Sequence, residues 1–166
     1  MSPRWKRFRP GPDETLVVSL APEEMQLLEQ LPSQLREVFD APESDPAAAR
    51  LFPRAYLDPT EEEAEAEFEA LVQPELLRDR LDALELVTAS FSRAVPAGEW
   101  REIALRPDDV SAWLGVLNDL RLVLGTRLGI SEDERQVADD DPNIAAYAVY
   151  DWLTYLQGEL VEQLLG

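Results

Sequence analysis

The most apolar stretch of the chain, residues 113–129, contains the polar side chains best suited to chemistry or to holding a partner: Asn118, Asp119, Arg121 and Arg127. Arg127 follows apolar residues at helical spacing, which places a guanidinium on an apolar face. Because an unpaired buried charge costs several kcal/mol, Arg127 needs an anionic partner. Asp151 falls on an inward line of a second apolar stretch. We therefore expect Asp151 to pair with Arg121 or Arg127, and the two helices to be neighbours.

Two roles are open to this predicted polar cluster. A buried ion pair that fixes the register of two helices is the commoner role, and it is the interpretation we favour. A ligand pocket built on the same arginines is the alternative. Both interpretations would be wrong if Asp151 and both arginines pointed into bulk water.

The composition argues against an enzyme. The chain has no histidine and no cysteine, which removes the usual neutral-pH general base, the thiolate nucleophile and the commonest metal ligands. The acidic run at 139–141 does not fit a calcium loop, because Ile144 and Tyr150 stand where a glycine and a bidentate acid are required. The glutamates of residues 61–69 are typical of a solvated helix face. We expect no catalytic residue, no metal site and no cofactor.

The charge of the chain is large and unevenly placed. The formal net charge is −19, yet a candidate basic arm lies within the first nine residues: Arg4, Lys6, Arg7 and Arg9. The acidic remainder would repel a nucleic-acid backbone, so direct DNA binding would have to use this arm. The alternation of basic and aromatic residues in this arm is equally typical of an edge strand whose charges prevent pairing with another chain, and we favour this interpretation. The acidic body fits docking on a basic protein surface, although such a charge also serves solubility alone.

The positions of these residues depend on the elements that the pattern predicts. We expect a mainly α fold of the α+β class in which residues 1–166 form a single domain. Residues 1–20 are predicted to form a basic β-hairpin arm with strands at 5–9 and 15–20, and residues 21–166 a helical body. A strand at 100–105 is expected to join the hairpin in a small antiparallel sheet. Helices are predicted near 22–39, 47–52, 60–94, 107–129 and 142–165, with Pro32 and Pro74 interrupting two of them.

Helical spacing also predicts which side chains face the core. The third long helix is expected to bury one line of residues: Leu77, Leu81, Leu84, Thr88 and Phe91. The last helix is expected to bury another: Val149, Leu153, Leu156, Leu160 and Leu164. Gly125 should permit close helix approach, and Gly129 should end its helix. No apolar run is long enough to span a bilayer and no secretory signal is seen, so the predicted location is the cytoplasm.

Three stretches together resemble a known family. They are Leu51–Tyr56, the run from Trp113 through Asn118-Asp-Leu-Arg-Leu-Val-Leu-Gly-Thr-Arg-Leu-Gly129, and Tyr147 through Tyr150-Asp-Trp-Leu153. Their aromatic residues form a signature: Phe52, Tyr56, Trp113, Tyr147, Tyr150 and Trp152. The chain resembles, over nearly its whole length, an actinobacterial family long described as a domain of unknown function and later named after an oxidative stress transcriptional regulator, AosR.

The resemblance implies a non-enzymatic cytoplasmic regulator that acts with the transcription machinery through a σ factor or RNA polymerase. It also implies a cysteine-based redox switch, which this chain cannot use because it has no cysteine. An acidic adaptor or structural interaction protein unrelated to transcription is the alternative. The oligomeric state is left open, with a homo-oligomer among the alternatives.

Overall fold

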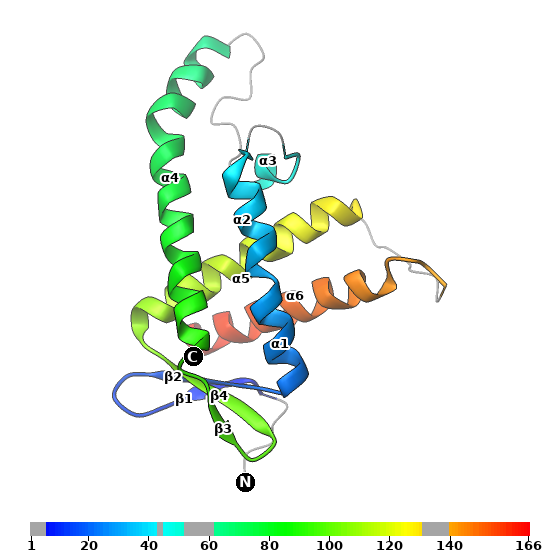
Figure 1. Cartoon of the computed structure of the whole chain (residues 1–166). Coiled ribbons are helices and arrows are strands. Elements are labelled where there is room, and N and C mark those ends of the chain that lie inside the picture. Colours follow the sequence, from blue (N-terminus) through cyan, green and yellow to red (C-terminus); the bar gives the residue numbers. More distant parts are fainter. Residues whose placement is uncertain (1–5, 43–44, 52–61, 131–139) are drawn as a thin grey trace.

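The computed structural model describes residues 6–42, 45–51, 62–130 and 140–166. Four strands and six helices follow one another along these residues, and Figure 1 shows the sheet at one end of a layer of crossing helices. The elements are β1 (Phe8–Pro10), β2 (Leu16–Leu20), α1 (Pro22–Gln30), α2 (Pro32–Asp40), α3 (Ala48–Leu51), α4 (Glu62–Phe91), β3 (Val95–Ala97), β4 (Trp100–Leu105), α5 (Pro107–Leu128) and α6 (Ile144–Leu165). The mainly α fold with a small antiparallel sheet is confirmed.

The sheet has the strand order β1-β2-β4-β3, and every pair is antiparallel. The predicted hairpin and the strand at 100–105 are confirmed, because β2 pairs with β4 in the register Leu16 to Leu105. β3 was not predicted, since Pro96 was expected only to break the chain. Proline is acceptable there because β3 is an edge strand, and Gly98 (φ 63°) supplies the tight turn into β4.

The two edge strands, β1 and β3, have no free outward-facing amide over their described residues. On β1, the Phe8 N–H donates to the Glu159 carboxylate of α6 at 3.1 Å. The next outward position is Pro10, which has no N–H. On β3, Ala97 pairs with Trp100 across the turn, which directs the nitrogen of Pro96 outward. An incoming strand would therefore find no amide to pair with on β1 or β3, which disfavours association at these two strands.

Prolines act differently in the two helices where they were expected to cause breaks. Pro32 does separate α1 from α2, as predicted. Pro74, in contrast, lies inside the continuous 30-residue helix α4, so the predicted interruption there is wrong. Pro74 is exposed, and the carbonyl that loses its helical partner can bond to water on that side.

The buried line of α4 also differs from the predicted one. Leu84 and Val87 are buried and Ser90 is fully enclosed, whereas Leu77 and Leu81 are only half-buried. Thr88 is exposed, and its hydroxyl donates to the Leu84 carbonyl within the helix. The prediction is therefore confirmed for Leu84 and in part for Leu77, Leu81 and Phe91, which pack against the core, and it is wrong for Thr88.

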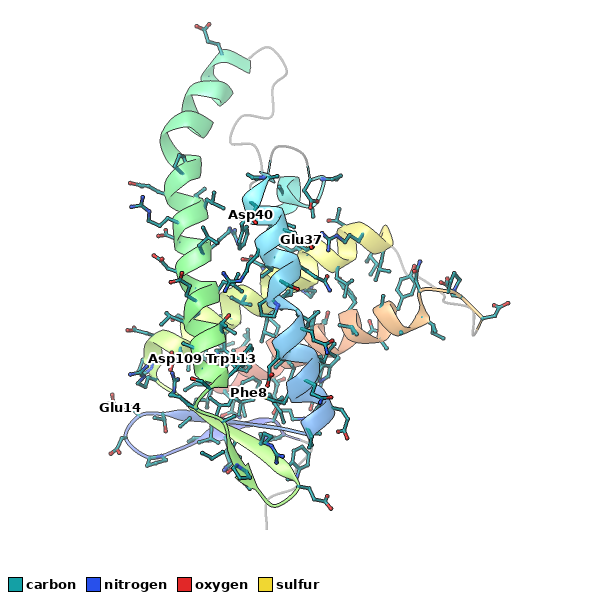
Figure 2. All side chains as sticks on the ribbon, in the orientation of Figure 1. Phe8, Glu14, Glu37, Asp40, Asp109 and Trp113 are labelled. Atoms are coloured by element: carbon teal, nitrogen blue, oxygen red, sulfur yellow. The ribbon has the colours of Figure 1, made fainter. Side chains whose placement is uncertain are left out.

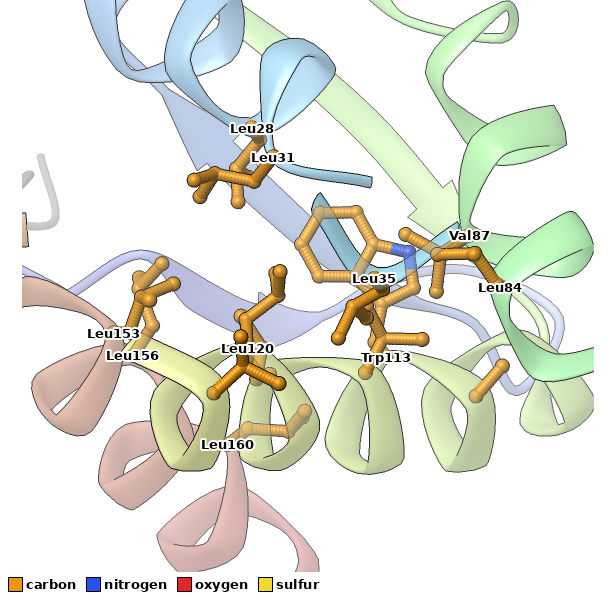
Figure 3. Packing of buried hydrophobic residues seen from close by; sticks show 14 of the residues in the cluster. Leu28, Leu31, Leu35, Leu84, Val87, Trp113, Leu120, Leu153, Leu156 and Leu160 are labelled. Carbon is orange, nitrogen blue, oxygen red and sulfur yellow. The ribbon is translucent and has the colours of Figure 1, made fainter. Parts of the chain in front are cut away.

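Helix α5 lies at the centre of the core. Figure 3 shows Trp113 of α5 beside Leu35 of α2 and Val87 of α4, and Leu120 of α5 toward the leucines of α6. Along α6, three of the predicted core residues are fully buried, whereas Val149 is half-buried and Leu164 is 54% exposed. α5 begins at Pro107 and ends at Gly129, which has the left-handed conformation (φ 69°), as predicted. No helix in the described part of the chain is long and apolar enough to cross a membrane.

Candidate functional site

The polar residues predicted to form a cluster lie on α5 and α6, but they do not converge on one site. Asp119 faces α4, Asn118 faces α6, and Arg127 faces the region of α2. The prediction that α5 and α6 are neighbours is confirmed, because Gln157 of α6 donates to the Asn118 side chain at 3.2 Å. α5 therefore connects three neighbouring elements through separate polar contacts.

The contact between α5 and α4 is an ion pair of Asp119 with Arg80. Asp119 is 3% exposed, and the Arg80 guanidinium also donates to the Leu51 carbonyl of α3 at 2.9 Å. Burial raises the pKa of Asp119, and the hydrogen bond and charge of Arg80 lower it in part. Sequence reasoning missed Arg80, because nothing in the local pattern of α4 shows which arginine meets a residue 39 positions away.

A second buried carboxylate, Asp109, joins the first turn of α5 to the end of α4. It accepts hydrogen bonds from Arg93 at 2.5 Å and from the Arg106 backbone N–H at 3.0 Å. One turn further along α5, the Trp113 indole donates to the Ser90 hydroxyl at 2.9 Å. Figure 2 shows Asp109 and Trp113 at this junction. The acidic first turn after Pro107 was a usable signal for Asp109 as a cap, although not for its contact with Arg93.

Arg127 does not occupy the buried position that its spacing predicted. Its side chain is 37% exposed and lies 3.5 Å from the Asp45 carboxylate, with Gln34 as a second acceptor at 3.3 Å. The prediction fails because Arg127 is in the last turn of α5, where the core has already ended. Its carboxylate partner in the structure is Asp45.

Arg121 of α5 and Asp151 of α6 are the other two residues that were predicted to pair. Arg121 donates to the Asn118 side-chain oxygen at 3.1 Å, and its Nε is buried. Asp151 is exposed on α6. The pairing of Asp151 with Arg121 stays a prediction. The Asn118 side-chain oxygen accepts from Arg121 of the same helix and from Gln157 of α6, and the second of these bonds joins the two helices.

The aromatic signature residues of α5 and α6 have packing roles. The Tyr150 ring lies against Gly125, where an added Cβ would come within 3.2 Å of the ring, so close helix approach at this glycine is confirmed. Tyr147 donates to the Leu128 carbonyl at 3.5 Å, and the Trp152 indole donates to Glu24 at 3.0 Å. Phe52 and Tyr56 lie outside the described residues.

The arginines of the predicted basic arm are engaged within the fold. Arg7 forms an ion pair with Glu24 at 3.2 Å and lies 5.1 Å from the centre of the Trp100 ring. Arg9 contacts Glu102 at 2.6 Å and the Ser19 hydroxyl at 2.7 Å. Lys6 is exposed, and Arg4 lies outside the described residues. The structure shows the edge strand that we favoured, with its charges used to hold the sheet and α1.

Open hollows lie on the surface of the described residues. One open hollow of about 440 Å³ lies between the start of α1 and the β3–β4 turn, and Trp100 and Arg101 are among its lining residues. Another, of about 380 Å³, lies beside the first turn of α5. Among the residues described, no group of three acidic ligands is arranged to hold a metal ion.

Comparison with known proteins gives one family and several relatives. A family model described as Domain of unknown function (DUF2017) matches residues 2–164. The chain is 29% identical over 193 residues to the oxidative stress regulators AosR of Mycobacterium tuberculosis and Mycobacterium bovis, covering 98% of this chain and 88% of each relative. A putative oxidative stress regulator AosR of Mycobacterium leprae is 28% identical over 197 residues with the same coverage. No solved structure matches the chain.

Proposed function

This chain belongs to the DUF2017 family, and we propose that it is a non-enzymatic regulator of the oxidative stress response that acts on transcription by binding another protein. The observation that carries this proposal is the similarity to named oxidative stress regulators over 98% of the chain. A similarity of this extent includes α5 and all the elements that pack on it.

The arrangement of charge supports a protein partner over direct contact with DNA. Arg7 and Arg9 are held in ion pairs within the sheet and α1, so DNA binding through them would require these contacts to break. With a net charge of −19, the chain is attracted to basic surfaces and repelled by phosphate backbones. We propose a σ factor or RNA polymerase as the partner.

The controlling signal, in this proposal, does not pass through a thiol. The chain has no cysteine, so neither a disulfide nor a sulfenic acid can form on it. Regulation would then depend on a partner that senses the oxidant, or on the amount of this protein in the cell.

A deletion strain exposed to peroxide tests the proposal. We expect stress-dependent transcripts to change in the deletion strain, to return with the wild-type gene, and RNA polymerase or a σ factor to co-purify with the tagged protein. Normal transcripts in the deletion strain would contradict the proposal. Altered transcripts with no component of the transcription machinery recovered would favour an indirect adaptor.

A further inference from the structure

Three exposed leucines gather where α4 ends, α5 begins and α6 ends. Leu86 of α4 is 38% exposed, and Leu164 and Leu165 of α6 are 54% and 84% exposed. Figure 1 shows these parts of the three helices together at one corner of the molecule. Leucines exposed to this extent within one region are typical of a contact surface, whereas scattered single ones are not.

Contacts between the helices place these leucines around the first turns of α5. Leu86 lines the hollow of about 380 Å³ together with the first turn of α5, including Pro107 and Asp108. α6 runs antiparallel to α5, with Gln157 beside Asn118 and Tyr150 beside Gly125. The same register, continued toward the end of α6, places Leu164 beside the start of α5.

The outer ridge of α5 between the two groups of leucines consists of small residues. Ser111 and Gly115 are exposed there, and a Cβ added to Gly115 would meet no heavy atom within 4 Å. On one side of this ridge Asp109 faces α4, and on the other Asn118 faces α6. Small side chains flanked by large apolar ones form a groove that can accept the side chains of an incoming helix. We define the corner surface as Leu86, Ser111, Gly115, Leu164 and Leu165.

The rim of this surface is mainly acidic. Asp82 precedes Leu86 by one turn of α4, Glu162 precedes Leu165 on α6, and Asp108 lines the hollow; all three are exposed. Two arginines lie close to these carboxylates. Arg106, whose side chain is 67% exposed, lines the same hollow and contacts Asp109 at 3.5 Å, and the exposed Arg78 precedes Asp82 by one turn of α4. An apolar centre inside a charged rim is the usual anatomy of a protein interface, and in this rim the acids outnumber the bases.

We propose that the corner surface docks a basic amphipathic helix of a partner protein. Apolar side chains of that helix would contact the three leucines, and its lysines or arginines would meet Asp82, Asp108 and Glu162. A second copy of this chain is a poorer occupant, because it would bring the same carboxylates against one another. Nucleic acids and anionic membranes are repelled for the same reason. This inference deepens the proposed function and takes from it only the existence of a protein partner.

A synthetic peptide tests the surface directly. The probe is a fluorescent peptide of about 18 residues with leucine on one helical face and lysine on the other, compared with a scrambled peptide of the same composition. Binding to the full chain is measured by anisotropy at several salt concentrations. We expect saturable binding of the amphipathic peptide that weakens with salt, and weaker binding of the scrambled one.

Matched leucine substitutions locate the binding site. Leu86→Gln with Leu164→Gln should raise the Kd about tenfold, a loss of about 1.4 kcal/mol. The control is Leu76→Gln with Ile144→Gln, because Leu76 is 39% exposed on α4 and Ile144 is 44% exposed on α6, both away from the corner. The control pair should change the Kd less than twofold, within the ordinary range for surface substitutions.

Several outcomes would overturn the inference. They are equal effects of the two variant pairs, equal binding of both peptides, or a homodimer that the corner variants dissociate, since that would make a second copy the occupant. The proposed function can fail separately. If the peptide binds at the corner but the deletion strain responds normally to peroxide, the function is wrong and the surface stands. If the strain is defective but the corner variants bind the peptide normally, the surface is wrong and the function stands.

Discussion

The ion pair of Asp119 with Arg80 predicts an asymmetry between its two partners. Asp119 has a side chain that is 4% exposed, whereas the Arg80 side chain is 29% exposed. Removing Arg80 leaves a buried carboxylate without its counter-charge, while removing the charge of Asp119 leaves a guanidinium that can still reach water. Arg80→Met should therefore destabilise the protein more than Asp119→Asn.

The magnitudes follow from the burial of the pair. Removing one partner of a buried ion pair costs about 3–5 kcal/mol of stability. Because Arg80 is partly exposed, we expect the cost of Arg80→Met to lie near the lower end of this range. Asp119→Asn keeps a hydrogen-bond acceptor and relieves a desolvated charge, so we expect a loss of about 1 kcal/mol. The double variant should be more stable than Arg80→Met alone, because the uncompensated charge is gone.

The pH dependence distinguishes this mechanism from a loss of packing. Burial raises the pKa of Asp119, and Arg80 opposes this shift, so removing Arg80 raises the pKa further. A carboxyl with a raised pKa contributes stability that is complete below its unfolded-state pKa and is lost as the pH rises through its folded-state pKa. The destabilisation caused by Arg80→Met, relative to wild type, should therefore be smaller at pH 5 than at pH 7.

Urea unfolding followed by tryptophan fluorescence measures these differences. A loss of about 3 kcal/mol shifts the midpoint by about 1–2 M for typical urea slopes. Arg78→Met is the matched control, because Arg78 is exposed on the same helix and should change stability by less than about 0.5 kcal/mol. The reasoning would be refuted if Asp119→Asn cost more than Arg80→Met, or if the effect of Arg80→Met were the same at both pH values.

Three further substitutions test local features of the fold. Glu14→Gly should stabilise the protein by about 0.5–1 kcal/mol in urea unfolding, because Glu14 has φ 63° in the hairpin turn, and a loss of stability would contradict this. Glu159→Ala should cost about 1–3 kcal/mol and increase self-association in gel filtration, because it uncovers the edge amide of Phe8; Glu159→Gln, which keeps the acceptor, should do neither. Gly125→Ala should lower the melting temperature because its Cβ meets an aromatic ring of α6, whereas Gly158→Ala, with no neighbour within 4 Å, should raise it; equal effects would rule out the helix contact as the cause.

Much of the fold could be predicted because it depends on local signals. The turn before β2, the start of α5 at Pro107 and its end at Gly129 are set by residues whose backbone preferences act within a few positions. The strand at 100–105 was recognisable by its alternation, although β3 was hidden by Pro96. The helix break predicted at Pro74 was wrong for a related reason. The effect of a proline inside a helix depends on whether the carbonyl that loses its partner reaches solvent, which the sequence does not show.

The candidate site could be predicted only in part, because its contacts join distant positions. Asn118 was rightly placed beside α6, but periodicity alone could not show that Arg127 lies past the end of the core. Arg80, paired with Asp119 across 39 positions, and Glu159, bound to Phe8 across 151 positions, give no local sign of their roles. Such pairs arise from tertiary packing, and one sequence does not reveal them.

The placement of cations in the fold sharpens the electrostatic argument for a basic partner. Arg80 and Arg93 neutralise buried carboxylates. Arg7 binds Glu24 of α1, and Arg9 binds Glu102 of β4. These positive charges are used internally, so the surface is more acidic than an even distribution of the same charges would make it. The association rate of a basic partner with this acidic surface should fall with salt more steeply than its dissociation rate changes. Stopped-flow binding of the amphipathic peptide at two salt concentrations separates the two rates, and a salt effect confined to dissociation would show that this charge does not guide the encounter.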